Sequence, residues 1–135
     1  ESMVQERQRD VAAVYTLDAL QVSCGDPLIP TATATICDEL GVSHVVAATG
    51  TGPVDAAYQA IDKVVAVHGD LAEFSVKAIT RGIDAIGEVT VRITAEDGRV
   101  YTGRGADNDI IVSSAKAYVN SINRMIQTAR SKEGK

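Results

Sequence analysis

Hydrophobic residues recur along the chain at two spacings, and these spacings follow one another in the same order twice. A spacing of two residues, typical of a strand with one buried face, predicts six strands, at residues 14–24, 31–36, 42–48, 71–80, 88–94 and 99–104. Spacings of three and four residues, typical of an amphipathic helix, predict two helices, at residues 53–67 and 109–129. The order of these elements predicts an α+β fold built from two βββα units.

Glycine, proline and polar residues separate the predicted elements. Residues 25–30 (GDPLIP) and 81–87 (RGIDAIG) are predicted loops, and Asp97–Gly98 is typical of a tight hairpin turn. His68 and Gly69 predict the end of the first helix, with the glycine as its C-terminal cap.

The length of 135 residues fits one domain, which we predict to cover residues 15–129 as units 15–68 and 71–129. The polar segment 1–14 is predicted to be a linker remnant from a preceding subdomain. The charged residues 130–135 are predicted to form a loose tail.

The two predicted units match in the order of their elements, and several positions coincide, although few residues are identical. The matching apolar positions are Leu17, Leu20 and Val22 with Leu71, Phe74 and Val76, and Ala32, Ala34 and Ile36 with Val89, Val91 and Ile93. Glycines match as well, Gly41 with Gly98 and Gly50 with Gly105. The strand alternation slips once, at Ala19. Because a single unit would expose one sheet face and the stripe of its helix, we expect an internal duplication that forms a dimer.

The first glycine turn is the strongest candidate for a ligand site. Gly50 and Gly52 allow a sharp turn before a helix whose first residue is Pro53. Asp55 lies in the first helical turn, where a carboxylate interacts favourably with the helix dipole. The free amides of a helix start also bind anions such as carboxylates. An ordinary turn is the competing interpretation. Our hypothesis is that this start and the equivalent one at residues 107–109 face one small ligand.

Composition excludes several classes of function. The net charge is −5, without a dense basic patch, so nucleic-acid binding is not expected. No apolar run approaches the length of a membrane span and no signal peptide is visible, so we predict a cytoplasmic protein. Cys24 and Cys37 fall on predicted strands and are expected to be buried free thiols. Neither has a zinc-ligand spacing to His44 or His68, so no metal site is predicted.

The sequence contains no combination of residues that predicts a catalytic site. Asp84 and Glu88 have the spacing of an acid–base pair, but a turn and a solvated strand edge explain them as well. A free-standing small enzyme that uses this pair or His44 is kept as an alternative. Other reactive side chains are expected to be structural or on the surface, Tyr58 and Tyr118 in the core and Ser113 and Ser114 exposed on the second helix.

Several blocks resemble, in the same order, the C-terminal regulatory domain of 2-isopropylmalate synthase. These blocks are residues 20–23 (LQVS), 30–34 (PTATA), 47–57 (AATGTGPVDAA), 82–91 (GIDAIGEVTV) and 103–107 (GRGAD). The resemblance runs from about Tyr15 to Ile126. The regulatory domain of citramalate synthase is similar, but the GRGAD block favours isopropylmalate synthase.

This resemblance implies a regulatory function. The family's enzyme condenses acetyl-CoA with 2-oxoisovalerate in leucine synthesis, in a TIM barrel with a divalent metal that lies N-terminal to the regulatory domain. The chain is then expected to form a homodimer, to bind L-leucine and to inhibit the barrel, without a cofactor or catalytic residue of its own. Two alternatives are a citramalate synthase domain that binds isoleucine and a dimerisation module without an effector.

In the family, the effector lies between the two units, near the dimer interface. The matching positions in this chain are Gly50, Thr51, Gly52, Leu71, Phe74, Ala78, Ala85 and Ile110. Relatives often carry tyrosine at the position of Phe74, so a hydroxyl contact is lost there. The leucine carboxylate is expected at the helix-start amides, and its ammonium at backbone carbonyls or at Asp107 or Asp109. Both aspartates are equally well explained as caps of the second helix.

Overall fold

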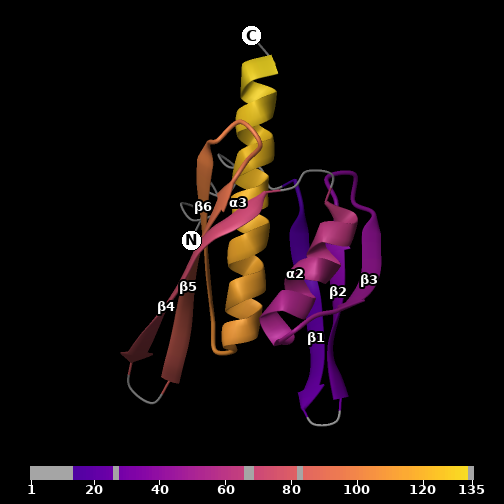
Figure 1. The fold of residues 1–135 in the computed structure, drawn as a ribbon, viewed down its shortest axis with the longest axis vertical. Coiled ribbons are helices and arrows are strands. Elements are labelled where there is room, and N and C mark those ends of the chain that lie inside the picture. The colour runs from indigo at the N-terminus through magenta and orange to yellow at the C-terminus, as the bar shows by residue number, and fades with distance from the viewer. Residues whose placement is uncertain (1–13, 26–27, 66–68, 82–83, 134–135) are drawn as a thin grey trace.

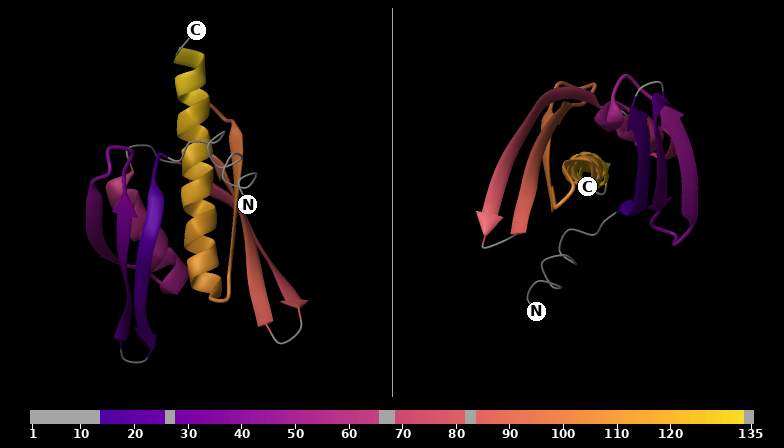
Figure 2. Two further views of the ribbon diagram at one scale, coloured as in Figure 1. Left: turned by 180° about the vertical axis from the view of Figure 1, so that it is seen from behind. Right: turned by 90° about the horizontal axis from the view of Figure 1, so that it is seen from below.

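The fold has three layers, with the helices between two antiparallel sheets (Figure 1, Figure 2). The computed structural model describes residues 14–25, 28–65, 69–81 and 84–133. The first unit comprises β1 (Thr16–Gly25), β2 (Leu28–Cys37), β3 (Ser43–Thr49) and α2 (Pro53–Val64). The second comprises β4 (Asp70–Arg81), β5 (Asp84–Thr94), β6 (Val100–Asp107) and α3 (Ile110–Glu133). The predicted pair of βββα units is therefore confirmed.

The strand registers of the two sheets are equivalent. In the first sheet, β1 residues Leu17, Leu20 and Val22 lie opposite Ile36, Ala34 and Ala32 of β2. In the second, β4 residues Leu71, Phe74 and Val76 lie opposite Ile93, Val91 and Val89 of β5. An irregularity interrupts both registers at the same point, between Leu17 and Ala19 in β1 and between Leu71 and Glu73 in β4. This shared β-bulge confirms the duplication and explains the slip in the alternation.

The two helices run parallel, side by side between the sheets. The Tyr58 hydroxyl donates to the Ser114 carbonyl at 3.2 Å and the Tyr118 hydroxyl donates to Asp62, so both bonds join residues 56 positions apart. The tyrosine rings stack with their centroids 4.3 Å apart. Both tyrosines are buried, as predicted, and burial raises the pKa of both hydroxyls. Because both hydrogen bonds join residues 56 positions apart, the helices point in the same direction and start at the same end of the domain, as Figure 1 shows.

Helix α3 links the two units. It packs on β5 and β6 of its own unit and also contacts β1 and α2. Gly103 and Gly105 of β6 lie directly beneath it, where a Cβ on either residue would overlap the backbone of Ala117. Further along α3, the side chain of Asn123 donates to the carbonyl of Tyr15 and accepts from its amide, both at 2.9 Å. One core of buried residues therefore spans both halves, with Ile36, Ile61, Ile93 and Ile122 fully buried.

The first predicted loop, at residues 25–30, is wrong in part because β2 begins at Leu28. Pro30 is tolerated in this strand because the β1–β2 register shifts beside it, so its missing N–H interrupts no pairing. Its carbonyl still accepts a hydrogen bond from the Gly50 amide at 3.0 Å.

The second predicted loop, at residues 81–87, is also wrong in part, because β5 begins at Asp84. Residues 84–87 pair with residues 78–81 of β4, so the partner strand overrides the local loop composition. Residues 82–83 lie outside the described residues.

Both predicted helix ends need correction. Helix α2 ends at Val64 rather than at residue 67, and its cap is Val65, in an extended conformation, rather than Gly69. The β-branched pair at 64–65 disfavours helix continuation. Helix α3 continues beyond residue 129 to Glu133, into the predicted tail. Residues 1–13 of the predicted linker, His68 and residues 134–135 lie outside the described part of the chain.

The prediction that both cysteines are buried is wrong. Cys24 is exposed near the end of β1, and Cys37 is half-buried at the end of β2. Cys37 follows the fully buried Ile36, so strand alternation directs it to the outer face of the sheet. Both thiols are free.

Candidate functional site

The start of α2 presents its backbone amides without a side-chain cap. Gly52 is the N-cap residue, and no side chain hydrogen-bonds there. The Asp55 carboxylate instead accepts a hydrogen bond from the Thr51 amide at 2.9 Å. A Cβ on Gly50 would overlap the Ala56 amide, so this position of the turn requires glycine. A Cβ on Gly52 meets no atom within 4 Å, so the space beside the helix start is open.

The start of α3 carries carboxylates instead. Asp109 caps the helix, since its Oδ1 accepts from the Ile111 amide at 2.8 Å. Asp107 accepts from the Asp109 amide at 3.0 Å and pairs with Lys116 Nζ at 3.1 Å. Capping is therefore confirmed for Asp109, and contact of either aspartate with an effector stays a prediction. The neighbouring helix starts differ: no side chain caps α2 at Gly52, although the Asp55 carboxylate lies on the Thr51 amide, whereas a carboxylate caps α3.

Asp107 gives the site a pH dependence. The hydrogen bond from the Asp109 amide, and then the one from Lys116, lower the pKa of Asp107 below its ordinary value of 3.8. A carboxyl with a lowered folded-state pKa stabilises the fold above that ordinary value, and the contribution is lost as the pH falls through the folded-state pKa. As the pH is lowered from about 4.5 to about 2.5, we expect the unfolding free energy of the Asp107→Asn variant to fall less steeply than that of the parent chain. Urea unfolding across this range measures both slopes, and equal slopes would contradict the expectation.

Strand β4 carries an apolar strip, here called the β4 strip, formed by Leu71, Phe74 and Val76. These side chains face the same side of the sheet as the buried residues opposite them, Ile93, Val91 and Val89. They are nevertheless 49%, 38% and 49% exposed. Among the described elements, β4 contacts β5 alone and forms the free edge of its sheet. The β4 strip is therefore an uncovered extension of the core face.

Ile110 lies next to this face of the second sheet. A Cβ on Gly87 would overlap the Ile110 side chain, so Ile110 packs on the bare backbone of β5. Gly87 pairs with Ala78 of β4 on one side and with Asp107 of β6 on the other. Three predicted site residues, far apart in sequence, thus surround one glycine. Ala85 pairs with Thr80, nearer the end of the β4–β5 hairpin.

Ser113 also belongs to this cluster, which the sequence did not reveal. We expected Ser113 and Ser114 to be exposed, and both are fully buried. The Ser113 hydroxyl lies 2.8 Å from the Gly87 carbonyl, and the Ser114 hydroxyl donates to the Ile110 carbonyl at 2.8 Å. Burial costs little because helix and strand carbonyls satisfy both hydroxyls. The small size of the pair, at helix positions facing the sheet, was the available signal.

The predicted site residues fall into two groups. The first surrounds Gly87 and continues along β4; it contains Leu71, Phe74, Ala78, Ala85, Asp107, Asp109 and Ile110. The second lies at the α2 start and contains Gly50, Thr51 and Gly52. Since β4 contacts no described element of the first unit, one chain does not bring the β4 strip against the α2 start.

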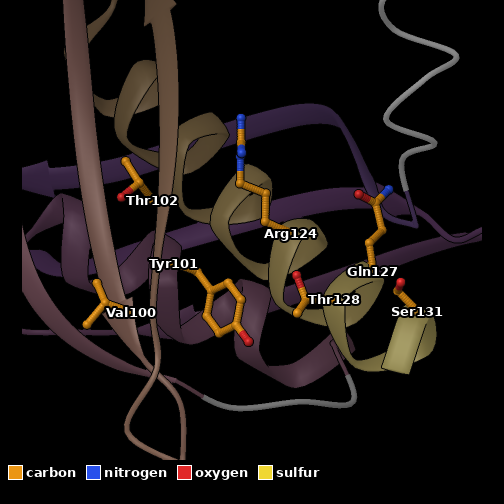
Figure 3. A pocket seen from close by; sticks show the side chains of 7 residues that line it. All are labelled: Val100, Tyr101, Thr102, Arg124, Gln127, Thr128 and Ser131. Atoms are coloured by element: carbon orange, nitrogen blue, oxygen red, sulfur yellow. The ribbon is translucent and has the colours of Figure 1, made fainter. Parts of the chain in front are cut away.

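Two cavities on the described surface lie away from the predicted residues. The larger, of about 430 Å³, lies between β6 and the second half of α3, as Figure 3 shows; its lining is Val100, Tyr101, Thr102, Arg124, Gln127, Thr128 and Ser131. A second, of about 340 Å³, lies between β6, α3 and the start of β1. Neither lining includes a predicted residue.

Asp84, Glu88 and His44, the residues considered for a catalytic role, lie in strands or near a hairpin turn. Glu88 lies on β5, the middle strand of its sheet, and Asp84 begins that strand, so the predicted edge and turn positions are wrong. His44 Nε2 lies 2.9 Å from Asp38 Oδ2 at the β2–β3 turn. Within the described ranges, no group of three or more His, Cys, Asp or Glu residues is placed to hold a metal ion. No described helix combines the length and apolar character needed to cross a membrane.

Comparison with known proteins identifies the family to which this duplicated βββα fold belongs. Residues 1–126 match the LeuA allosteric (dimerisation) domain, and the chain belongs to this family of regulatory domains. It is similar to 2-isopropylmalate synthases: 78% identical over 135 residues to that of Olsenella uli, 52% over 125 residues to that of Trichodesmium erythraeum, and 47% over 125 residues to that of Gloeobacter violaceus.

These matches cover 100% of this chain for the first relative and 93% for the other two. The chain spans only 26%, 23% and 23% of the relatives' own lengths, and it aligns with their C-terminal part. The resemblance to the regulatory domain of 2-isopropylmalate synthase, predicted from the sequence blocks, is confirmed.

Proposed function

We propose that this domain binds L-leucine and, within a longer polypeptide, mediates feedback inhibition of 2-isopropylmalate synthase. The regulated reaction is the condensation of acetyl-CoA with 2-oxoisovalerate. The catalytic barrel, with its divalent metal, belongs to the polypeptide N-terminal to this domain. Family membership and the alignment with the C-terminal part of the synthases support this assignment.

The polarity of the neighbouring helix starts is the observation that carries the proposal. A free amino acid has a carboxylate and an ammonium on one carbon atom. The uncapped α2 start at Gly52 suits the carboxylate, because its amides carry partial positive charge. The carboxylates of Asp107 and Asp109 at the α3 start suit the ammonium, because ionised acceptors form stronger hydrogen bonds and accept more than one.

The apolar residues suit the branched side chain of leucine. Ile110 and Val76, the end of the β4 strip nearest Gly87, provide exposed apolar surface near the α3 start. Burying a leucine side chain against such surface contributes about 2 kcal/mol. Because Gly87 has no side chain, Ile110 packs directly on the backbone of β5.

A second copy of the chain completes the site in this proposal. In an isolated chain, the β4 strip is exposed to water and the outer edge of β4 pairs with no described strand. Exposed apolar surface and an unpaired strand edge both favour association with another chain. A homodimer that covers the β4 strip removes both exposed features and adds the surface that one chain lacks. The effector then lies close to the dimer interface, and its binding is linked to how the two copies pack.

Calorimetry with leucine, isoleucine and valine tests the function. We expect leucine to bind with a negative heat-capacity change, because apolar surface is buried. We expect valine, which lacks one methylene, to bind more weakly by about 1–3 kcal/mol. Tighter binding of isoleucine would assign the domain to the citramalate synthase type. Absence of heat with all three would reduce the function to dimerisation alone.

A further inference from the structure

The internal duplication gives each unit an equivalent hairpin turn, so the two turns can be compared directly. The β2–β3 turn at residues 38–42 and the β5–β6 turn at residues 95–99 have the same backbone. Gly41 and Gly98 have φ values of +84° and +87°. Each glycine amide donates to the carbonyl three residues earlier, at 3.0 Å and 2.9 Å. Each turn is closed by a second bond, from Asp38 to Val42 at 3.0 Å and from Ala95 to Arg99 at 2.8 Å.

The side chains of the two turns differ in character. The second turn carries Asp97 and Arg99, an exposed ion pair at 3.7 Å. The equivalent positions of the first turn carry Leu40, which is 84% exposed, and Val42, which is 50% exposed. The second turn shows that this backbone accepts charged residues at both positions. The apolar residues of the first turn are therefore not a requirement of the turn.

The first turn is held rigidly despite its exposed tip. The Asp38 carboxylate accepts the amides of Leu40 and Val42 at 2.9 Å and 3.0 Å and also contacts His44. Glu39 accepts two hydrogen bonds of 2.7 Å from Arg130 near the end of α3, so the turn also contacts the helix layer. A rigid apolar tip loses little conformational freedom when it binds, which favours recognition.

The turn lies beside the start of β1, the first described strand. Thr16, the first residue of β1, pairs with Cys37, and Cys37 pairs with Ser43, so the start of β1 and the turn share one end of the first sheet. Figure 1 shows β1 beginning at the end where β2 and β3 are joined. In the relatives, about three quarters of the polypeptide lies outside the part that matches this chain, and this chain aligns with the C-terminal part.

We propose that Leu40 and Val42 form a docking knob that packs against the part of the full-length polypeptide preceding this domain. The partner surface is an apolar depression on that part, within reach because the connecting chain joins the domain beside the knob. The inference rests on the proposed function only in placing this domain at the C-terminal end of a longer chain. Leucine binding is not required for it.

Site-specific photo-cross-linking in the full-length protein tests the contact. A benzoylphenylalanine replaces Leu40, and the matched control replaces Ile29, which is 68% exposed on β2 of the same sheet. We expect position 40 to cross-link to peptides N-terminal to this domain, at a severalfold higher yield than position 29. Cross-links from position 40 only to a second copy of this domain would overturn the proposal. Equal yields from both positions, or no cross-link from position 40, would overturn it too.

A double substitution, Leu40→Asp with Val42→Arg, gives the first turn the side chains of the second turn. The domain is expected to fold normally, because Asp97 and Arg99 already occupy this backbone. In the full-length protein, undocking is expected to speed limited proteolysis between the two parts by at least about fivefold. The control Ile29→Asp is expected to leave that rate unchanged. An unchanged rate in the double variant contradicts docking, whereas failure of leucine to bind in calorimetry contradicts only the proposed function.

Discussion

Gly52→Asp is expected to abolish leucine binding while leaving the fold intact. The new carboxylate occupies the open space beside the α2 start, where a Cβ meets no atom within 4 Å. It there takes the place of the effector carboxylate and repels it. We expect the affinity for leucine to fall at least about 100-fold, which corresponds to about 2.7 kcal/mol. Calorimetry measures the affinity.

Stability and affinity should change independently in this variant. Aspartate is a preferred N-cap residue, so the unfolding free energy is expected to stay equal or rise by a few tenths of a kcal/mol. The matched control is Gly52→Asn, which has nearly the same shape and capping ability but no charge. It is expected to retain more affinity than the aspartate variant. Unchanged leucine affinity in Gly52→Asp would show that the carboxylate binds elsewhere.

Gly103→Ala is expected to cause the largest loss of stability of any single-methyl addition in the β6–α3 contact. The added Cβ overlaps the Ala117 carbonyl and the Ser121 amide of α3. Helix backbone cannot rotate away as a side chain does, so α3 must move off the sheet. Overpacking costs about 1–3 kcal/mol, and we expect a value near the upper end.

Urea unfolding at a constant m-value measures this loss. The matched control is Ala106→Val, an addition on the exposed face of the same strand, which is expected to change stability by less than about 0.5 kcal/mol. A similar small change in Gly103→Ala would mean that α3 accommodates the methyl group by a local shift. The tight helix–strand contact would then not be a constraint on the fold.

The fold follows largely from local patterns. Alternation and helical spacing predict the two βββα units because each strand has one face on the helices and each helix buries one stripe. Even the bulge in β1 is visible, as the slip beside Ala19. The first part of β5, residues 84–87, is not visible as a strand, because it gains its strand conformation from pairing with β4. The end of α2 is likewise decided by Val65, which turns into an extended conformation.

For the candidate site, the sequence predicts which residues belong to it but not how they are arranged. Family blocks in the sequence indicate Ala78, Ile110 and the glycine turn, but not which of them touch. That Ile110 rests on Gly87 depends on the register of β5 with both neighbours, which no local pattern encodes. The burial of Ser113 follows from the same contact. Exposure of the β4 strip is a tertiary property as well, since its composition matches that of a buried strand face.

The two hydrogen bonds between Tyr15 and Asn123 join residues 108 positions apart, the longest sequence separation among the side-chain bonds described here. During synthesis, the first strand therefore emerges from the ribosome long before its last partner. Contacts of such separation slow folding, because closing a long loop costs conformational entropy before the contact compensates for it. This contact between the two repeats therefore forms only after residue 123 has been synthesised, however early the first repeat is complete.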